Sequence, residues 1–172
     1  MDLLKEIRVV PDFPKKGINF FDITTVLQNP EAFKAAIDEF IKIAEKIDFD
    51  VILGLESRGF FFASVMAYKM GKSYAPVRKK GKLPFETVSQ EFALEYGTDT
   101  LEIHKDAVKK GQKVLIIDDL LATGGTVSAA AKLAEKLGGE VSGIIFLIEL
   151  ENIGGRNALK DYNVNSIIKT NE

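Results

Sequence analysis

The sequence predicts an α/β fold in which helices flank a mainly parallel, twisted sheet. Short apolar runs that suit buried strands alternate with segments in which apolar residues recur at helical spacing. The clearest strand, Val114–Ile117, contains only leucine and β-branched residues, a composition typical of a strand covered on both faces. A length of 172 residues suits a single domain, which would bury about 70% of the surface of the unfolded chain.

The amino-terminal part, at about residues 1–28, should form a small irregular hood after a short initial helix. Its segment Pro11–Thr24 (PDFPKKGINFFDIT) is rich in proline, glycine and aromatic residues and has no sustained period. Asn29 and Pro30 then supply an N-cap and a first-turn proline for an amphipathic helix. The apolar positions of this helix are Phe33, Ile37, Phe40, Ile41, Ala44 and Ile47.

Strands and helices alternate through the rest of the chain. Val51–Leu53 is a short strand ending in Gly54, and residues 59–71 form a buried helix closed by Gly71, with Phe60, Phe61 and Phe62 used for packing. A polar, basic segment at about residues 78–92 contains Gly81 and Pro84, which favours a mobile loop. The other expected elements are strands at Tyr74–Val77, Val141–Ile148 and Val164–Ile168, a hairpin at Phe92–Ile103, and helices at Thr126–Leu137 and near Arg156–Asp161.

Composition limits the possible partners and compartments. The net charge of −2 gives no reason to expect binding to nucleic acid or membranes, so any anion must be held locally. The chain has no cysteine, which excludes disulfides and thiolate metal sites and agrees with a reducing compartment. Without an apolar signal region or a run of about 20 apolar residues, a cytoplasmic protein is expected.

The segment Val114–Thr126 (VLIIDDLLATGGT) carries the most chemical information. A buried strand ends in two adjacent acids and passes through a glycine turn into a helix, and ligands of such sheets bind beyond the carboxyl ends of the strands. Backbone amides and the positive end of the helix make the turn an anion cradle. Asp118 and Asp119 point to different sides and suit two adjacent sugar hydroxyls. Neither GxxxxGK[ST] nor GxGxxG is present.

The motif DDLLATGGT resembles the phosphoribosyl-pyrophosphate motif of the type I phosphoribosyltransferases, in its adenine-using form. The resemblance covers nearly the whole chain, because FPKKGINFFDIT, GLESRGF, VRKKGKLP and LEYGTDTLEIHKDA follow in the order of the family. It implies the type I phosphoribosyltransferase fold. The implied reaction transfers ribose 5-phosphate from phosphoribosyl pyrophosphate to N9 of adenine in purine salvage, giving AMP and pyrophosphate.

The resemblance also distributes the parts of the donor among segments. The 5′-phosphate falls to Ala122, Thr123, Gly124, Gly125 and Thr126, and the ribose hydroxyls to Asp118 and Asp119. The resemblance implies that pyrophosphate is bound by Glu56, Ser57, Arg58, Gly59, Arg78, Lys79 and Lys82. It also implies that Arg58 is catalytic and that the Glu56–Ser57 peptide is cis. Mg²⁺ would be bound through the substrate, without a direct protein ligand.

The base falls to the hood and to two further residues. The resemblance implies that Phe20 stacks on adenine, that backbone groups of Asn19 and Phe21 read its edge, and that Leu150 contacts the other side. Glu95 in LEYG matches a carboxylate near adenine N7 and would act as the general acid. Many relatives have arginine where this chain has Phe21. The single histidine, His104, is expected to be a surface residue.

Two alternatives remain open at the level of sequence. The first is a phosphoribosyltransferase for another base, such as xanthine, hypoxanthine or orotate, with the same phosphate site. The second is a regulator that binds phosphoribosyl pyrophosphate without catalysis, although such proteins need a basic nucleic-acid surface or an added domain. The resemblance further implies a homodimer.

Overall fold

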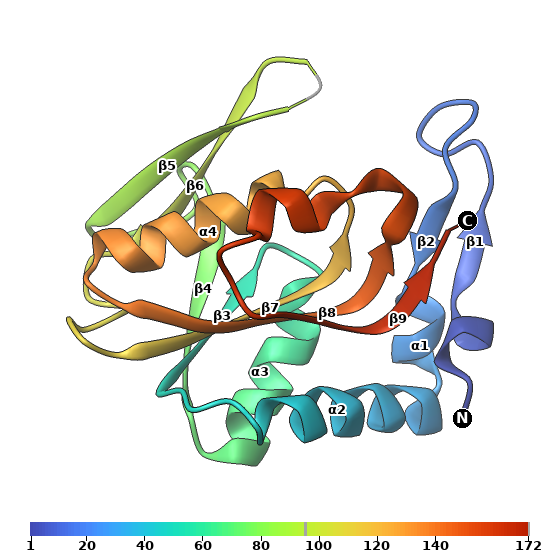
Figure 1. The fold of residues 1–172 in the computed structure, drawn as a ribbon, viewed down its shortest axis with the longest axis horizontal. Coiled ribbons are helices and arrows are strands. Elements are labelled where there is room, and N and C mark those ends of the chain that lie inside the picture. Colours follow the sequence, from blue (N-terminus) through green and yellow to red (C-terminus); the bar gives the residue numbers. More distant parts are fainter. Residues whose placement is uncertain (95, 172) are drawn as a thin grey trace.

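A computed structural model describes residues 1–94 and 96–171, within which seven strands form one sheet (Figure 1). The strands are β3 (Val51–Leu55), β4 (Ser73–Lys79), β5 (Thr87–Ala93), β6 (Thr98–His104), β7 (Lys113–Leu121), β8 (Glu140–Leu150) and β9 (Val164–Thr170). Their spatial order is β5-β6-β4-β3-β7-β8-β9. The strands β4, β3, β7, β8 and β9 each pair in parallel with the next in this order. At one edge, β5 and β6 form an antiparallel hairpin, which joins the sheet through an antiparallel pairing of β6 with β4. The predicted mainly parallel α/β sheet is confirmed.

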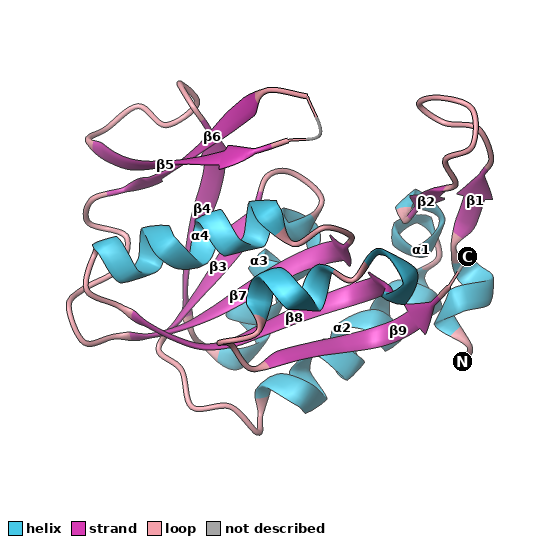
Figure 2. Cartoon of the chain, turned by 45° about the horizontal axis from the view of Figure 1, so that its top comes forward, coloured by secondary structure: helices cyan, strands magenta, loops and turns pink. Residues whose placement is uncertain are grey.

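Helices cover both faces of this sheet, as Figure 2 shows. α2 (Pro30–Ala44) and α3 (Gly59–Met70) lie on one face, and α4 (Gly125–Lys136) lies on the other with the 3-10 helix η3 (Gly155–Leu159). Shorter elements are η1 (Leu3–Glu6), α1 (Thr24–Gln28) and η2 (Glu151–Ile153). In the described part of the chain, no helix has the length and apolar character needed to cross a membrane.

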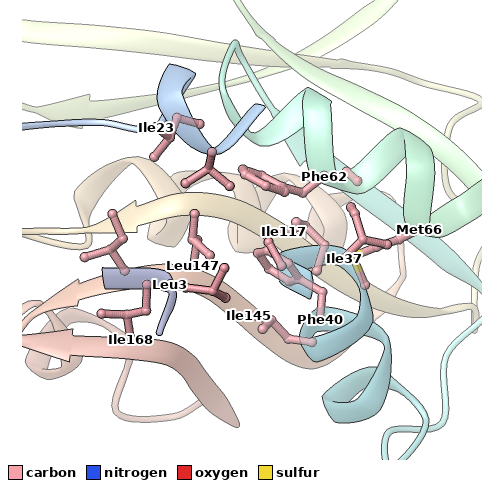
Figure 3. Packing of buried hydrophobic residues seen from close by; sticks show 14 of the residues in the cluster. Leu3, Ile23, Ile37, Phe40, Phe62, Met66, Ile117, Ile145, Leu147 and Ile168 are labelled. Carbon is pink, nitrogen blue, oxygen red and sulfur yellow. The ribbon is translucent and has the colours of Figure 1, made fainter. Parts of the chain in front are cut away.

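The two faces of β7 explain why its sequence is continuously apolar. Leu115 and Ile117 enter the cluster beneath α2 and α3, and Val114 and Ile116 enter the cluster beneath α4. Figure 3 shows the first cluster, in which Ile117 lies near aromatic and aliphatic side chains from both helices. Each such side chain contributes about 1.5–3 kcal/mol through burial, so the strand that carries the site is firmly held.

The capping residues behave as the sequence predicts. Asn29 Oδ1 accepts hydrogen bonds from the amides of Glu31 (3.1 Å) and Ala32 (3.4 Å), and Pro30 is the first residue of α2. Gly71 closes α3 with a φ of 63°, a left-handed conformation that favours glycine. Phe62 packs between the helices as expected, whereas Phe61 is exposed.

Four predictions about local structure were wrong in part. The hood contains two paired strands, β1 (Arg8–Val10) and β2 (Phe20–Asp22), each too short to show a period. The predicted loop at about 78–92 becomes a strand from residue 87 onward, because β5 pairs along its whole length with β6. Strand β7 continues past both aspartates to Leu121, since its pairing with β8 extends that far. The helix predicted near Arg156–Asp161 is the shorter 3-10 turn η3.

Candidate functional site

A cavity of about 290 Å³ lies where β3, β4 and β7 reach their carboxyl ends. This is the edge at which ligands of parallel sheets bind, because the loops that leave the strands converge there. The cavity brings together side chains from segments up to about seventy positions apart in the sequence. The sequence-predicted residues that line it are Glu56, Ser57, Arg58, Lys79, Asp118, Asp119, Ala122, Thr123, Gly124 and Thr126.

The turn after β7 has the backbone geometry of an anion cradle. Gly124 has a φ of 82°, and a Cβ there would lie 2.6 Å from the carbonyl oxygen of Gly155. Only glycine therefore fits this position without strain. Gly125, by contrast, is the first residue of α4, so one glycine of the pair rather than both takes a positive φ. The amino end of a twelve-residue helix then faces the cavity with its backbone donors.

The aspartate pair contributes two carboxylates of different environment. Asp119 is buried at 4% exposure, and its amide donates to Oδ1 of the half-buried Asp118 at 2.9 Å. Burial raises the pKa of Asp118, and the negative charge of Asp119 raises it further. Burial also raises the pKa of Asp119, although the guanidinium of Arg58 opposes the shift. Hydrogen-bond donors or positive charge that approach the pair would therefore stabilise its ionised form.

Arg58 lies between the aspartates and the hood. Its Nε is 3.0 Å from Asp119 Oδ2, and its Nη1 donates to the carbonyl oxygen of Phe21 at 3.4 Å. The guanidinium carbon is 5.0 Å from the ring centre of Phe20, a distance at which a cation is attracted to an aromatic face. One side chain thus connects the predicted ribose and adenine regions.

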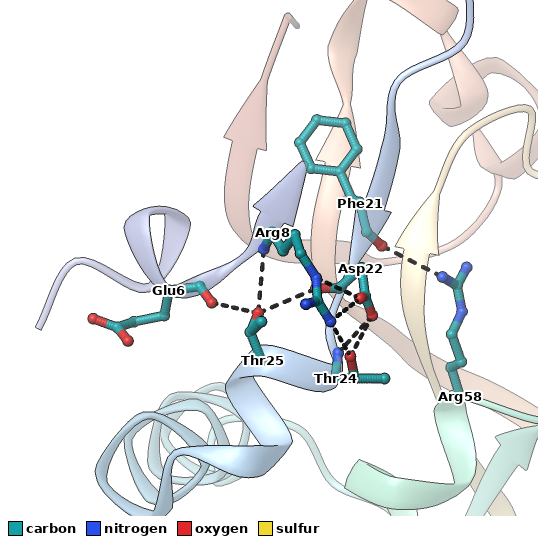
Figure 4. Close-up of polar contacts among 7 residues, drawn as sticks. All are labelled: Glu6, Arg8, Phe21, Asp22, Thr24, Thr25 and Arg58. Atoms are coloured by element: carbon teal, nitrogen blue, oxygen red, sulfur yellow. Dashed lines mark hydrogen bonds and ion pairs between the residues drawn. The ribbon is translucent and has the colours of Figure 1, made fainter. Parts of the chain in front are cut away.

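Hydrogen bonds fix the hood in front of this arginine, as Figure 4 shows. Arg8 donates from Nε (2.9 Å) and Nη2 (2.6 Å) to Asp22 Oδ2. Thr25 Oγ1 donates to the carbonyl oxygen of Glu6 at 2.6 Å and accepts from the amide of Arg8 at 3.2 Å. β2 therefore presents Phe20 and the Phe21 backbone toward Arg58, while the Phe21 side chain is buried in the core.

The loop after β3 is tied to the end of β4. Glu56 accepts hydrogen bonds from the Lys79 amide at 2.8 Å and from Arg78 Nε at 3.3 Å. Burial raises the pKa of Glu56, but these two donors outweigh it and hold the pKa below its ordinary value. The Glu56–Ser57 peptide is cis, as the family resemblance implies.

Gly59 allows the start of α3 to approach β7 closely. A Cβ on this residue would lie 2.8 Å from the carbonyl oxygen of Ile117 and 2.9 Å from Asp118 Oδ1. Glycine is therefore required by packing, and the residue places the loop of Ser57 and Arg58 directly beside the aspartates.

Several predicted residues lie around the cavity rather than in its lining. Arg78 is held by Glu56, the Lys82 side chain is exposed, and Leu150 is the buried last residue of β8. Glu95 lies outside the described residues. The hood residues Phe20 and Phe21 approach the cavity through Arg58, and Asn19, which precedes them, is exposed. His104 is half-exposed and accepts a long hydrogen bond of 3.4 Å from the Phe85 amide.

Sequence reasoning missed the side of the cavity formed by the β5–β6 hairpin and the start of α4. Asp99 accepts a hydrogen bond from Lys79 Nζ at 2.6 Å, and this bond lowers the pKa of Asp99. The stretch LEYGTDT, already singled out for Glu95, contains Leu94 and Asp99 and was the available signal. The additional lining residues are Phe92, Leu94, Asp99, Leu101, Leu120, Leu121 and Val127.

Potential metal ligands are sparse. Within residues 1–94 and 96–171, no cluster of three or more histidine, aspartate or glutamate side chains could hold an ion. The buried Oδ2 of Asp119 accepts no hydrogen bond from a described residue, despite the nearby guanidinium, so it has capacity for a donor brought by a ligand.

Comparison with known proteins agrees with this geometry. The model of the phosphoribosyl transferase domain family matches residues 22–172. The adenine phosphoribosyltransferase of Ruminiclostridium cellulolyticum is 61% identical over 170 residues, which are 98% of this chain and 99% of that protein.

Solved structures extend the similarity to three dimensions. The adenine phosphoribosyltransferase of Thermoanaerobacter pseudethanolicus superposes with a TM-score of 0.96 at 55% identity, covering 98% of each chain. The Saccharomyces cerevisiae enzyme of the same name, solved with an imino-altritol bisphosphate and adenine, has a TM-score of 0.93 at 38% identity over 96% of each chain.

Proposed function

The chain belongs to the phosphoribosyl transferase domain family, and we propose that it transfers ribose 5-phosphate from phosphoribosyl pyrophosphate to adenine. The products are AMP and pyrophosphate. The observation that carries this function is the cavity in which a glycine turn, an aspartate pair and an arginine meet. The chain is therefore a pentosyl-transferring enzyme, as are the relatives that it matches along nearly its whole length.

We assign the 5′-phosphate to the turn from Ala122 to Thr126. The left-handed Gly124 and the start of α4 support this role, because both turn backbone donors toward the cavity. Asp118 and Asp119 accept hydrogen bonds from the ribose 2′ and 3′ hydroxyls. The buried Oδ2 of Asp119, which accepts no hydrogen bond from a described residue, supports this assignment, since a hydroxyl donor would satisfy it.

Pyrophosphate binds to the loop from Glu56 to Gly59 and to the basic segment that begins at the end of β4. Departure of pyrophosphate leaves positive charge on the sugar, so the enzyme must hold the leaving anion and exclude water. Arg58 and Lys79 supply cationic donors within the cavity lining. The Glu56 carboxylate acts by holding Arg78 and the Lys79 amide in place. Closure of the segment that contains Lys82 remains a prediction.

Adenine lies between the hood and the end of β8, near Leu150. Phe20 stacks on the ring, and backbone groups of Asn19 and Phe21 read its edge. The fixed position of β2, held by Arg8 and Asp22, supports this placement because a preorganised strand loses little freedom on binding. Glu95 remains the predicted general acid.

Mg²⁺ would be held mainly by the oxygens of phosphoribosyl pyrophosphate. Asp118 and Asp119 would support it indirectly by binding the ribose hydroxyls, and their oxygen donors suit this cation. When bound, the ion neutralises charge that develops on the leaving pyrophosphate. The cytoplasmic location of the protein rests on the sequence alone and stays a prediction.

The chain acts as a homodimer through the outer side of α3. Phe61 is 46% exposed and Tyr68 is 88% exposed, and they lie two turns apart on this helix. A second copy would cover these side chains, and Phe61 lies within one turn of Arg58. Sedimentation of the protein and of its Tyr68→Glu variant tests this assembly, and an unchanged monomeric mass in both would contradict it.

Incubation of the protein with phosphoribosyl pyrophosphate, Mg²⁺ and a panel of bases tests the function. Adenine should give AMP and pyrophosphate, whereas xanthine, hypoxanthine and orotate should give little product. Preference for another base would identify a related transferase. Binding of the donor without turnover of any base would identify a regulator.

A further inference from the structure

An ion pair between a buried carboxylate and a half-exposed guanidinium lies beside the phosphate turn and outside the cavity lining. Glu149, near the end of β8, accepts hydrogen bonds from Arg156 Nε at 2.6 Å and Nη2 at 2.8 Å. Its side chain is 5% exposed, and Ser166 Oγ donates to it at 2.6 Å. Two parallel bonds from a planar guanidinium fix both the distance and the orientation of the partner.

The pair holds η3 at a defined place between β8 and β9. Arg156 is the second residue of η3, and its Nη1 also donates to the carbonyl oxygen of Val164 at 3.0 Å. Glu149 is the register partner of Leu121, the residue before the phosphate turn. Arg156 is thus tied to β8, which pairs with the turn-bearing strand β7, and to β9, the next strand outward.

η3 in turn touches the backbone of the phosphate turn. A Cβ on Gly155 would collide with the carbonyl oxygen of Ala122. A Cβ on Gly124 would lie 2.6 Å from the carbonyl oxygen of Gly155 and 3.2 Å from Ala158 Cβ. The two backbones are in such close contact that a shift of η3 by a few tenths of an ångström must displace the turn.

We propose that Arg156 and Glu149 are positioning residues, which hold η3 against Ala122 and Gly124 and so set the shape of the 5′-phosphate cradle. This inference rests on the proposed function, since it assumes that the turn binds the phosphate. Neither side chain lines the cavity, so their effect on the ligand passes through the backbone contacts of Gly155.

Replacing Arg156 alone leaves Glu149 as a buried, unpaired charge, which destabilises proteins for reasons unrelated to the cradle. Two variants separate the effects. Arg156→Lys keeps the positive charge but loses the two-pronged contact. The double variant Glu149→Gln with Arg156→Met removes both charges and leaves no ion unpaired.

Calorimetric titration with ribose 5-phosphate measures the affinity of the 5′-phosphate cradle, because this ligand has no base to contact the adenine region. We expect both variants to bind ribose 5-phosphate about tenfold more weakly. Steady-state assays of Arg156→Lys should show a raised KM for phosphoribosyl pyrophosphate with an unchanged KM for adenine. A purely structural pair would instead lower the urea midpoint and leave both the affinity and the KM at wild-type values.

Lys72→Met is the matched control for lost stability. Lys72 Nζ donates to the Phe49 carbonyl oxygen at 2.6 Å and lies 4.9 Å from the Phe49 ring centre, before β4 begins and at the opposite end of the sheet. Its loss should lower the urea midpoint without changing ribose 5-phosphate affinity. Wild-type affinity in folded Arg156→Lys and in the double variant would overturn the inference. Failure of the wild-type protein to make AMP would refute the proposed function instead.

Discussion

Arg58 Nε lies 3.0 Å from Oδ2 of Asp119, yet that buried oxygen accepts no hydrogen bond from any described residue. The two atoms are close, but the N–H group is not aligned with the oxygen as a hydrogen bond requires. The two side chains therefore attract each other as charges, and the carboxylate can still accept a hydrogen bond. An arginine beside a partly satisfied carboxylate suits a site that receives both an anionic leaving group and sugar hydroxyls.

Arg58→Gln should lower kcat/KM by about 10²–10³-fold, the range typical for loss of one donor that stabilises developing charge. The substitution removes the cation from Asp119 and from the ring of Phe20 together. Steady-state kinetics with adenine and phosphoribosyl pyrophosphate measure the effect. Lys69→Gln, which removes an exposed ion pair with Asp38 on the outer helices, should behave as wild type. Equal losses of kcat/KM in the two variants would show that Arg58 contributes no more to catalysis than an exposed lysine.

Gly59→Ala should destabilise the fold by about 1–3 kcal/mol, because the new methyl group overpacks a tight contact. The added Cβ would lie within 3 Å of the Ile117 carbonyl oxygen and of Asp118 Oδ1. Urea unfolding measures the change in the free energy of unfolding. Ser64→Ala, on the exposed side of the same helix, should have a small effect. Wild-type stability of Gly59→Ala would mean that α3 shifts freely away from β7.

Glu95→Gln should reduce kcat by about 10²–10⁴-fold, the contribution typical of a general acid, with little change in donor affinity. The amide cannot release a proton to the base. Turnover and calorimetric affinity for phosphoribosyl pyrophosphate are to be compared with those of Glu91→Gln, an exposed position on β5. Near-normal turnover of Glu95→Gln would remove the catalytic role.

Asp22 should make the hood sensitive to acid. Hydrogen bonds from the Thr24 hydroxyl and amide, aided by Arg8, lower the pKa of Asp22 from 3.8 to about 2. The stabilisation is therefore fully present above about pH 4 and is lost as the pH falls toward 2. Unfolding measurements over this range should show a shallower acid loss in Asp22→Asn than in Asp161→Asn, an exposed position after η3. Identical pH profiles would contradict the assignment.

The segment from Lys79 to Lys82 should become resistant to trypsin when phosphoribosyl pyrophosphate and Mg²⁺ are added together. Lys79 ends β4, and the turn that follows is exposed, so cleavage is expected in the free protein. Closure over pyrophosphate would bury these bonds. Mass spectrometry of timed digests locates the cuts. Cutting at the same rate with and without ligand would argue against a closing loop.

The sequence predicted those elements whose burial is recorded in local composition. Val114–Ile117 is apolar at every position because α3 and α4 cover opposite faces of β7, and Asn29 marks the start of α2 by its capping chemistry. The continuation of β7 through Asp118 and Asp119 was not predictable, because adjacent acids are poor strand formers. The strand continues only because its pairing with β8 extends past them. β5 was missed for the same reason, because its partner β6 determines the pairing.

The candidate site shows the same division. The turn, the aspartates and Arg58 could be selected from short motifs whose chemistry is local. Asp99 belongs to the stretch LEYGTDT, but its contact with Lys79 could not be predicted, because that contact depends on how the β5–β6 hairpin joins the sheet at β4. The contact between Gly155 and Ala122 likewise exists only after η3 folds back over the turn.

The turn containing Gly124 should hold a phosphate group, and calorimetric titration with AMP and with adenosine measures this binding. The two ligands share base and ribose and differ only in the 5′-phosphate. AMP should bind at least about a hundredfold more tightly, a difference of about 2.7 kcal/mol that charge-assisted bonds to phosphate can supply. Gly124→Ala should remove most of this difference. Equal affinities of the wild-type protein for AMP and adenosine would show that the turn does not hold the 5′-phosphate.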